Sequence, residues 1–482
     1  MWQIIKNEWS SFYRDRVLLG VFSSFLILLS ITVSLGSIHV EHQNTHHASS
    51  SEHIRDKWEN IQEMNPHSAA HYGTYVFKPT TLLSGLDDGV SNITGNVLKV
   101  EGHVQNEIVH SEASQSQAVS KFGKLKSALL LQYIVPIFLI FLAFHTINGE
   151  KLSGRLKLLI AQGASSSKIV FSKALSVWVI GLMLLLVTVF MYLLLNLGAI
   201  NYDTILRLSF FIISYSLYYF IIAFLTTFLS ISFNNTSTAL TSMLAVWVVW
   251  TIFLPNILMS TVESQHELPS RDIFKSNMKE DRSKGIDGHS PSSDRLVALR
   301  EKVLKDYGVD SLSQLSINFR GIVMQEDEEY GNKVWDKHFG NLRTVLKNQK
   351  KSYQLGGIIN PFIALQNTSK GFAASDNLHH QDFLVQVENY RRVFVRTLNN
   401  KDAYGGSKTG ERGWKADNAF FKSVPDFVFK PLKIMKVFKY AKKKLIVIKN
   451  GDHSLSKKNN LKKLTKEIGL IYHNLRPSRI VG

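Results

Sequence analysis

Histidine and aspartate side chains lie close together in one segment near the start of the chain, and these residue types are suited to chemistry. The segment contains His67, His71 and His103, with Asp87 and Asp88 between them. Imidazole and carboxylate groups bind metal ions and exchange protons. They could form a site if the segment folds compactly, but no spacing of a nucleophile and a base supports a membrane enzyme. We therefore favour ordinary packing and hydrogen bonding, and we expect no metal site.

A second group of histidines comes earlier in the chain and comprises His39, His42, His46, His47 and His53. Their spacing defines no coordination geometry, so we expect a solvated linker there. The chain has no cysteine. That excludes disulfide scaffolds, thiolate zinc sites, cysteine nucleophiles and iron–sulfur clusters.

Nucleotide-binding motifs are also missing from the sequence. No G-x-x-x-x-G-K-[ST] pattern occurs, and the residues 405–409, Gly-Gly-Ser-Lys-Thr, do not match it. The tripeptide at 152–154 begins like the signature of an ABC ATPase, but Arg155 does not continue it. We therefore expect a protein that is not an enzyme, holds no cofactor and hydrolyses no ATP by this route.

The elements that position these residues follow from the distribution of charge. Asp, Glu, Lys and Arg are absent from 55 consecutive residues, 208–262, and from 17–37, 127–147 and 174–202. Each stretch reaches the roughly 20 apolar residues that cross a bilayer. A short polar turn at 234–238 divides the longest stretch into a helical hairpin. The sequence thus predicts an α-helical polytopic membrane protein with five transmembrane helices and two extracytoplasmic, mainly helical insertions.

The predicted organisation has nine segments. They are an amphipathic lead with the first span (1–40), the first extracytoplasmic segment (41–126), the second span (127–147), a cytoplasmic loop (148–173), the third span (174–200), the fourth (208–231), the fifth (239–262), the second extracytoplasmic domain (263–429) and a basic tail (430–482). Within the large domain, helices are expected around 293–307 and 382–399.

Orientation follows from the basic residues of the short loops. The N-terminal lead and the 148–173 loop together carry eight Lys and Arg, whereas residues 41–126 carry seven basic and ten acidic residues. The positive-inside rule places the N-terminus and the 148–173 loop in the cytoplasm. Both large polar segments then face outward, in a multi-pass protein of the plasma membrane.

The 148–173 loop has a pattern of its own. An amphipathic stretch ends at a glycine, and a second stretch leads into the third span. Physical reasoning alone leaves two interpretations of the loop. It is an ordinary basic loop, or it is a pair of helices at the cytoplasmic face that transmit force from a soluble partner. The pattern resembles the coupling loop of type-2 ABC transporter permeases. The matching residues, in order, are Glu150, Gly154, Leu158, Leu159, Gly163 and Lys173.

A further resemblance concerns the two polar insertions. It is to a permease subfamily with large extracytoplasmic insertions after its first and fifth spans. The first insertion carries the motif residues Asn65, Pro66, His67, His71, Tyr72, Gly73, Asp87 and Gly89, and the second carries 360–367 with His379, His380 and Phe383. The resemblance implies a permease subunit that works with a cytoplasmic ABC ATPase and with a second permease copy or paralogue in the lipid bilayer.

The end of the chain departs from that subfamily. The net charge of +18 comes mostly from residues 430–482, which hold 15 Lys and Arg against two Asp and Glu. The family's sixth span is missing there. A disrupted reading frame is one explanation, and a basic tail that binds anionic surfaces is the other. The net charge is therefore no argument for nucleic-acid binding.

The sequence thus predicts the permease subunit of an ABC transporter, an exporter whose ATP is hydrolysed by a separate subunit. The alternative is a membrane-anchored extracytoplasmic scaffold that binds or assembles partners without transport.

Overall fold

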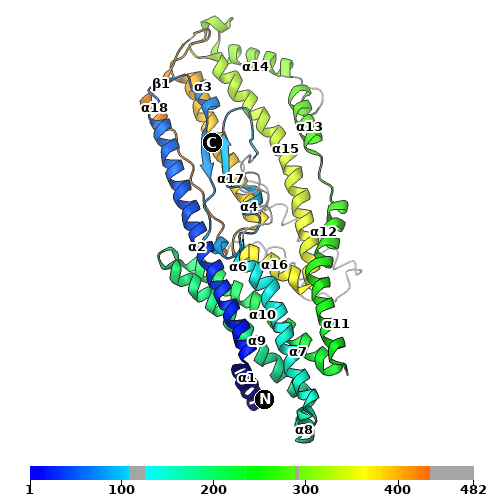
Figure 1. Ribbon diagram of the computed structural model, residues 1–482. Helices are drawn as coiled ribbons and strands as arrows, with labels where there is room; N and C mark the ends of the chain where they lie inside the picture. Colours follow the sequence, from blue (N-terminus) through cyan, green and yellow to red (C-terminus); the bar gives the residue numbers. More distant parts are fainter. Residues whose placement is uncertain (108–124, 234, 288–291, 412, 435–482) are drawn as a thin grey trace, which may run out of the picture. The chain divides into compact units, whose positions relative to one another are not determined.

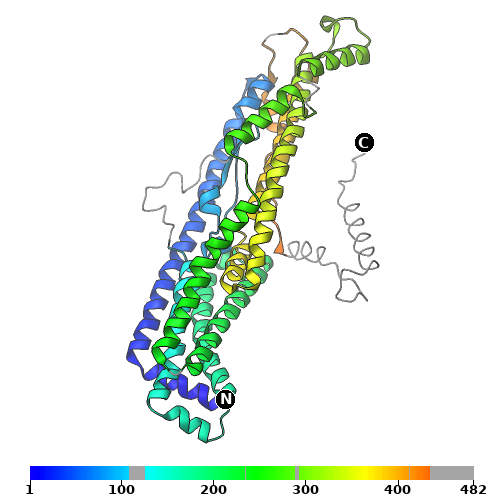
Figure 2. The ribbon, with the colours of Figure 1, turned by 90° about the vertical axis from the view of Figure 1, so that its right-hand side faces the viewer.

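The computed structural model describes residues 1–107, 125–233, 235–287, 292–411 and 413–434. The chain divides into two units, Met1–Lys430 and Pro431–Gly482. Nearly all of the basic tail lies outside the described residues, so its interpretation stays a prediction. The first unit, drawn in Figures 1 and 2, carries the helices and sites described below.

Among the described residues, five helices are long and apolar enough to cross a membrane, which confirms the predicted number. They are α2 (Arg16–Glu59), the run α6–η3–α7 (Ser127–Leu129, Leu130–Ile134, Val135–Leu152), α9 (Ser166–Leu195), α10 (Tyr202–Ser232) and the run α11–η5–α12 (Thr236–Val248, Val249–Phe253, Leu254–Gln265). Each exceeds the roughly 30 Å of the hydrocarbon core at 1.5 Å per residue.

The centre of the bundle is formed by α7, α9 and α10. Gly181 of α9 has no room for a side chain, because an added Cβ would lie 2.8 Å from Leu139 of α7 and 3.1 Å from Tyr219 of α10. A small residue at this point lets three helices approach closely, as is common in membranes. The apolar window of the second span is 67% buried, whereas that of the fifth span is 11% buried. The fifth span therefore lies at the edge of the bundle.

The N-terminal lead forms a separate helix, α1 (Trp2–Arg14), that packs on α9. Its Trp9 Nε1 donates a hydrogen bond of 3.2 Å to the carbonyl of Ser176. Asp15 then caps α2, because its carboxylate accepts hydrogen bonds from the amides of Val17 and Leu18. The cap separates the two helices at the point where the first span begins.

The polar insertions pack together into one region, which we call the head and define as residues 41–107 and 266–430. Its first insertion contains β1 (Glu63–Met64), α3 (Pro66–Tyr72), β2 (Thr74–Phe77), η1 (Leu82–Gly85), α4 (Ser91–Thr94) and β3 (Val97–Val100). Strands β2 and β3 are antiparallel, with Thr74 opposite Val100 and Phe77 opposite Val97. Besides these short helices and residues 41–59 of α2, the first insertion thus contains a small sheet that its sequence did not predict.

The second insertion is mainly helical. It contains α13 (Arg271–Lys284), α14 (Ser292–Tyr307), η6 (Leu312–Gln314), α15 (Phe319–Leu355), η7 (Gly356–Ile358), α16 (Pro361–Phe372), α17 (Asn377–Tyr404), β4 (Ala416–Asp417) and α18 (Asn418–Ser423). Helices α15 and α17 lie side by side, as both views show (Figures 1 and 2). The helices expected at 293–307 and 382–399 correspond to α14 and to part of α17. Strand β4 pairs with β1, which joins the two insertions.

The helix of the first span does not end at residue 40. Helix α2 continues without a break to Glu59, so the segment with the five histidines is helical where the sequence predicted a linker, and His42, His46 and His53 are exposed on it. The reason is tertiary, because the far end of α2 packs against the head through Trp58. There Trp58 is 3% exposed and packs against Phe394 and Phe421.

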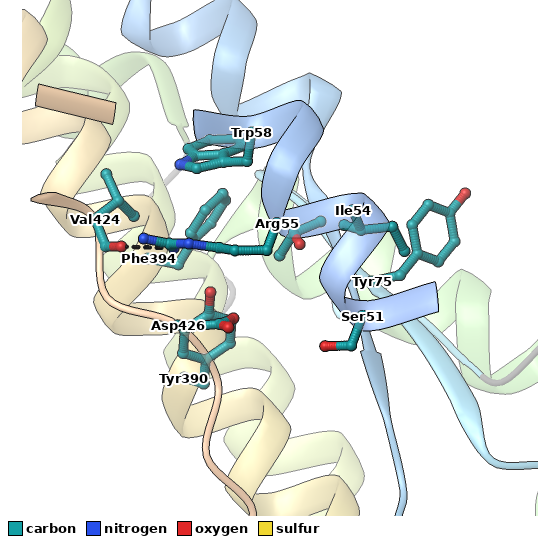
Figure 3. Close-up of a pocket in the computed structure, with 10 residues that line it drawn as sticks. Ser51, Ile54, Arg55, Trp58, Tyr75, Tyr390, Phe394, Val424 and Asp426 are labelled. Atoms are coloured by element: carbon teal, nitrogen blue, oxygen red, sulfur yellow. Dashed lines mark hydrogen bonds between the residues drawn. The ribbon is translucent and has the colours of Figure 1, made fainter. Parts of the chain in front are cut away.

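Arg55 on the same end of α2 reaches the last segment of the head (Figure 3). Its guanidinium donates to the carbonyl oxygens of Val424 at 2.9 Å and Lys422 at 3.2 Å, and its Nε donates to Glu59 at 2.6 Å. The pocket around it is lined by Trp58, Phe394 and other side chains. Because its donors are engaged by the protein, we read this pocket as a structural contact.

Two π-helical turns interrupt the second and fifth spans, η3 (Leu130–Ile134) and η5 (Val249–Phe253), and a proline lies two residues after the end of each. In η3 the amide of Val135 bonds the carbonyl of Leu130, so the next residue, Pro136, leaves the carbonyl of Leu131 without its backbone donor. Tyr219 of α10 supplies the donor instead, at 2.8 Å.

The fifth span repeats this arrangement. In η5 the amide of Leu254 bonds the carbonyl of Val249, and Pro255 follows it. The carbonyl of Trp250 therefore lacks its backbone donor. Asn360 of the head donates to it from Nδ2 at 2.8 Å. Each π turn is thus satisfied by a side chain from a neighbouring element, as membrane-embedded backbone requires.

Candidate functional site

The 148–173 segment forms a helical elbow at the end of the bundle that carries the N-terminus (Figure 1). Helix α7 ends at Leu152, the short helix α8 (Arg155–Ala161) follows, and α9 begins after Ser165, whose hydroxyl caps it. Gly154 and Gly163 sit at the two corners with φ angles of +73° and +85°. Residues with a side chain rarely adopt such angles, so glycine suits both corners for conformational reasons. A Cβ would meet nothing within 4 Å at either position.

Helix α8 exposes apolar side chains instead of burying them. Leu158 is 61% exposed and Ile160 is 51% exposed, and Leu152 just before the helix is 79% exposed. Leu159 is half-buried. Exposed aliphatic side chains gathered on one short element are typical of a surface that another molecule covers.

A buried ionic cluster, which we call the triad, holds this elbow on the bundle. The ammonium of Lys173 lies 2.5 Å from Oε1 of Glu8 and 3.0 Å from Oε1 of Glu150, and it also donates to the carbonyl of Thr146 at 3.2 Å. Lys173 is fully buried, with side-chain exposures of 12% for Glu8 and 15% for Glu150. The triad joins α1, α7 and α9 at a single cation.

Burial raises the pKa of Glu8 above its usual value, although the charge of Lys173 acts in the opposite direction and Glu150 reinforces the rise. Two carboxylates thus compete for one lysine. This balance makes the triad sensitive to any change that adds or removes one of its charges.

Lys151 makes a second connection from the same turn. Its ammonium donates to the carbonyl oxygens of Ser230 and Phe233 at 2.5 Å each, and to that of Ile231 at 3.2 Å. These carbonyls belong to the C-terminal end of α10, where a positive charge is favoured. Residues 150 and 151 therefore connect α7 to the other central helices, α9 and α10.

The structure divides the six loop residues predicted from the sequence into two groups. Glu150 and Lys173 meet in the interior, where they position the elbow and are poorly placed to touch a partner. Gly154, Leu158, Leu159 and Gly163 shape or line the outer part of the elbow. Sequence reasoning missed Glu8 and Lys151. Glu8 could have been found from the sequence, because it is an acidic residue within an apolar, tryptophan-rich lead.

The extracytoplasmic motif residues also fall into two places. Asp87 is 5% exposed and belongs to a polar network where the head meets the bundle. Its carboxylate accepts hydrogen bonds from Ser369 of α16 and from Gln132 of η3, and Gln132 also donates to Tyr215 of α10 at 2.9 Å. Tyr215 and Ser369 are 2.9 Å apart. The sequence did not identify Gln132 or Ser369, because neither lies in a recognisable pattern.

Gly89 lies beside this network. Its φ angle is +53°, and a Cβ there would lie 2.3 Å from the carbonyl oxygen of Ser375, so both conformation and space demand glycine. The neighbouring amide of Val90 donates to the same carbonyl at 2.9 Å. The Asp87–Gly89 turn therefore attaches the first insertion to the end of α16.

The remaining motif residues build α3 and its surroundings. Asn65 caps α3 by accepting from the amides of His67 and Ser68, and Pro66 occupies the first turn. Gly73 ends the helix at φ +67°, where a Cβ would lie 2.4 Å from the carbonyl oxygen of Val100 on β3. Tyr72 is half exposed.

Three of the histidines meet around α3. The rings of His67, His71 and His103 have centroids 4.6 to 5.4 Å apart. Burial, followed by the neighbouring imidazoles, lowers the pKa of His67 to about 4. Asp87, which the sequence placed with them as a candidate, belongs instead to the network with Gln132.

Comparison with protein families gives the class. Residues 61–276 match the ABC-2 family transporter protein model, and residues 271–430 match a domain of unknown function (DUF3526). The chain is a multi-pass membrane protein that carries an ABC transporter permease domain of the ABC-2 family, a family that lacks an ATPase domain. Such permeases typically pair with ATPase subunits. No curated protein and no solved structure matches the chain.

Proposed function

We propose that this chain is the permease subunit of an ABC exporter and that a separate cytoplasmic ATPase docks on helix α8. The observation that carries the proposal is the exposed apolar surface of α8, held on the bundle through the buried triad. An element that must transmit force needs a surface for the partner and a firm attachment to the moving helices. The α8 elbow has both features.

The route of force is supported by the contacts at its base. A push on α8 acts on Glu150 and Lys151. Glu150 meets Lys173 of α9 and Lys151 meets the end of α10. Movement of α8 is thereby passed to the three central helices at once. The network of Asp87, Gln132 and Tyr215 would pass the same movement on to the head.

The orientation and the assembly are part of the proposal. The N-terminus and α8 face the cytoplasm, and the head lies outside, in keeping with the basic residues around the elbow. A second permease copy or a paralogue completes the translocation path. Only 11% of the apolar window of the fifth span is buried. This span therefore offers an apolar face to lipid or to that copy.

The test is to co-express the chain with any ABC ATPase encoded next to its gene and to measure how much ATPase co-purifies. Leu158→Asp should reduce recovery of the ATPase at least about tenfold, because docking would bury an unpaired charge at a cost of more than about 1.4 kcal/mol. Leu158 is largely exposed, so the permease itself should keep its abundance. Ile93→Asp is the matched control, since Ile93 is 67% exposed but lies in the head.

The proposal fails if Leu158→Asp and Ile93→Asp retain the ATPase equally. If the wild-type chain retains no ATPase, the scaffold without transport becomes the better account.

A further inference from the structure

The three histidines around α3 are brought together by the backbone of the head. His67 and His71 are four residues apart on α3 and share one face of that helix. His103 arrives from the turn after β3. The preceding residue, Gly102, donates its amide to the carbonyl of Ala70 at 3.0 Å, and Ala70 is 1% exposed. This backbone contact fixes the turn against α3 and places His103 beside the pair.

The spacing of the ring nitrogens suits one metal ion. One ligand nitrogen from each of the three histidines lies within 4.8 Å of the other two. Nε2 of His67 and Nε2 of His71 are 3.2 Å apart. Two nitrogens on one tetrahedral zinc, each about 2.0–2.1 Å from it, are about 3.3 Å apart. The first pair already has that separation, and His103 completes the group of three.

His103 is held in a ligand-ready orientation by a buried carboxylate. Its Nδ1 lies 2.9 Å from Oε1 of Glu328, and its backbone amide donates to the same oxygen. Glu328 is only 3% exposed and its other oxygen accepts from Arg391 at 2.9 Å. Metal-binding histidines commonly donate their second ring nitrogen to a carboxylate in this way. Nε2 of His103 is then left for a metal.

The backbone of His103 is also unusual. Its φ angle of +64° makes it one of two non-glycine residues with positive φ among the described residues. Such a conformation costs free energy and is often found at functional sites. Here it is maintained by Glu328 and by Arg282, whose guanidinium donates to the carbonyl of His103 at 3.0 Å.

We propose that His67, His71 and His103 bind one divalent transition-metal ion of the zinc class through imidazole nitrogens, with Glu328 as a positioning residue. Neutral imidazole suits zinc, copper, nickel and iron, and zinc is the probe of choice. His71 is exposed, so the fourth coordination position opens to solvent and to an outside ligand. This inference is independent of the transport proposal, because it concerns the head alone.

Helix α2 supplies a matched pair for comparison. His42 and His46 are also four residues apart, and their Nε2 atoms lie 3.0 Å apart. Among the described residues no third histidine or acidic residue completes a group of three with them. Two imidazoles on a helix bind zinc far more weakly than three convergent ones. The pair on α2 therefore serves as the control for weak zinc binding by two histidines.

The experiment titrates the full chain in detergent micelles with Zn²⁺ by calorimetry after treatment with EDTA, and with Co²⁺ by visible absorption. The wild type should bind one zinc ion tightly and show the d–d bands of tetrahedral cobalt. His71→Ala and His103→Asn should each weaken binding more than about 100-fold, and His42→Ala should leave it unchanged. Asparagine is chosen at 103 because it tolerates positive φ.

Three results would overturn the proposal. They are a wild-type chain that binds no zinc at micromolar concentrations, binding that both His71→Ala and His103→Asn leave intact, and an equal loss in His42→Ala. Size-exclusion elution and the thermal midpoint of each variant show whether it is folded. Since His71 is exposed, its variant separates loss of a ligand from loss of the fold.

Discussion

Asn360 in the head donates a hydrogen bond of 2.8 Å to the carbonyl oxygen of Trp250 in the fifth span. That carbonyl lies five residues before Pro255 and so has no backbone donor in the π turn. Tyr219 does the same for Leu131, five residues before Pro136. In each of these two spans, a side chain from another element thus donates the hydrogen bond that the proline cannot. Tyr219 comes from a neighbouring span and Asn360 from the head. The fifth span is thereby fastened to the head.

The first prediction concerns the Tyr219 contact. Tyr219→Phe should destabilise the chain by about 1 kcal/mol, because it leaves the Leu131 carbonyl unpaired in an apolar interior. In a Pro136→Ala background the cost should nearly vanish, since residue 136 then supplies a backbone amide. The free energy of unfolding in mixed micelles measures both costs. An equal cost in the two backgrounds would show that the proline does not create the need for Tyr219.

The second prediction concerns the triad. Lys173→Met should cost on the order of 3–5 kcal/mol, because it leaves Glu8 and Glu150 together without a cation. The triple variant with Glu8→Gln and Glu150→Gln should recover most of that stability. Unfolding in mixed micelles again provides the measurement.

A surface pair serves as the control for the triad. Lys284 is 68% exposed and pairs with Glu280 at 2.9 Å. Lys284→Met should cost less than about 1 kcal/mol. If Lys173→Met is equally mild, the triad does not hold the elbow.

The third prediction concerns pH. Burial, assisted by the nearby charge of Lys78, lowers the pKa of His380 in α17 from 6.5 to about 4. The folded head therefore keeps this imidazole neutral where the unfolded chain protonates it. The stability from His380 is complete above pH 6.5 and is lost as the pH falls from 6.5 toward 4, by at most about 1.4 kcal/mol per pH unit.

The His380 contribution is isolated by comparing variants. His380→Leu removes the titrating group, so its thermal midpoint should fall less steeply between pH 7 and pH 5 than that of the wild type. Ile93→Ala, at a 67% exposed position of the head, changes no titrating group and should keep the wild-type slope. The measurement is made in EDTA so that bound metal does not contribute. Parallel slopes for all three chains would contradict the prediction.

The fourth prediction concerns orientation. The chain has no native cysteine, so single cysteines can be labelled without background. Ser166, Ser49 and Ser313 are all exposed. In intact cells an impermeant maleimide should label Ser49→Cys and Ser313→Cys, whereas Ser166→Cys near α8 should react only after permeabilisation. Labelling of Ser166→Cys in intact cells would contradict the prediction. It would show that the topology is inverted and that α8 does not face the cytoplasm.

The sequence alone determined the features that depend on local composition. Five spans follow from stretches without charge, because a bilayer core excludes charged side chains wherever the chain folds. The corner at Gly163 was visible in the sequence, because the amphipathic stretch ends at that glycine, whereas Gly154 was identified only through the resemblance. Helices α14 and α17 were recognised from their periodicity.

Only the tertiary structure decided which residues meet. Lys173 pairs with Glu8 because α1 packs on α9, and no pattern in either segment encodes that contact. His103 joins His67 because a backbone bond from Gly102 to Ala70 fixes the turn against α3. The continuation of α2 to Glu59 likewise depends on the burial of Trp58. Contacts between distant segments depend on how whole surfaces fit together, and that fit is a property of the packed chain.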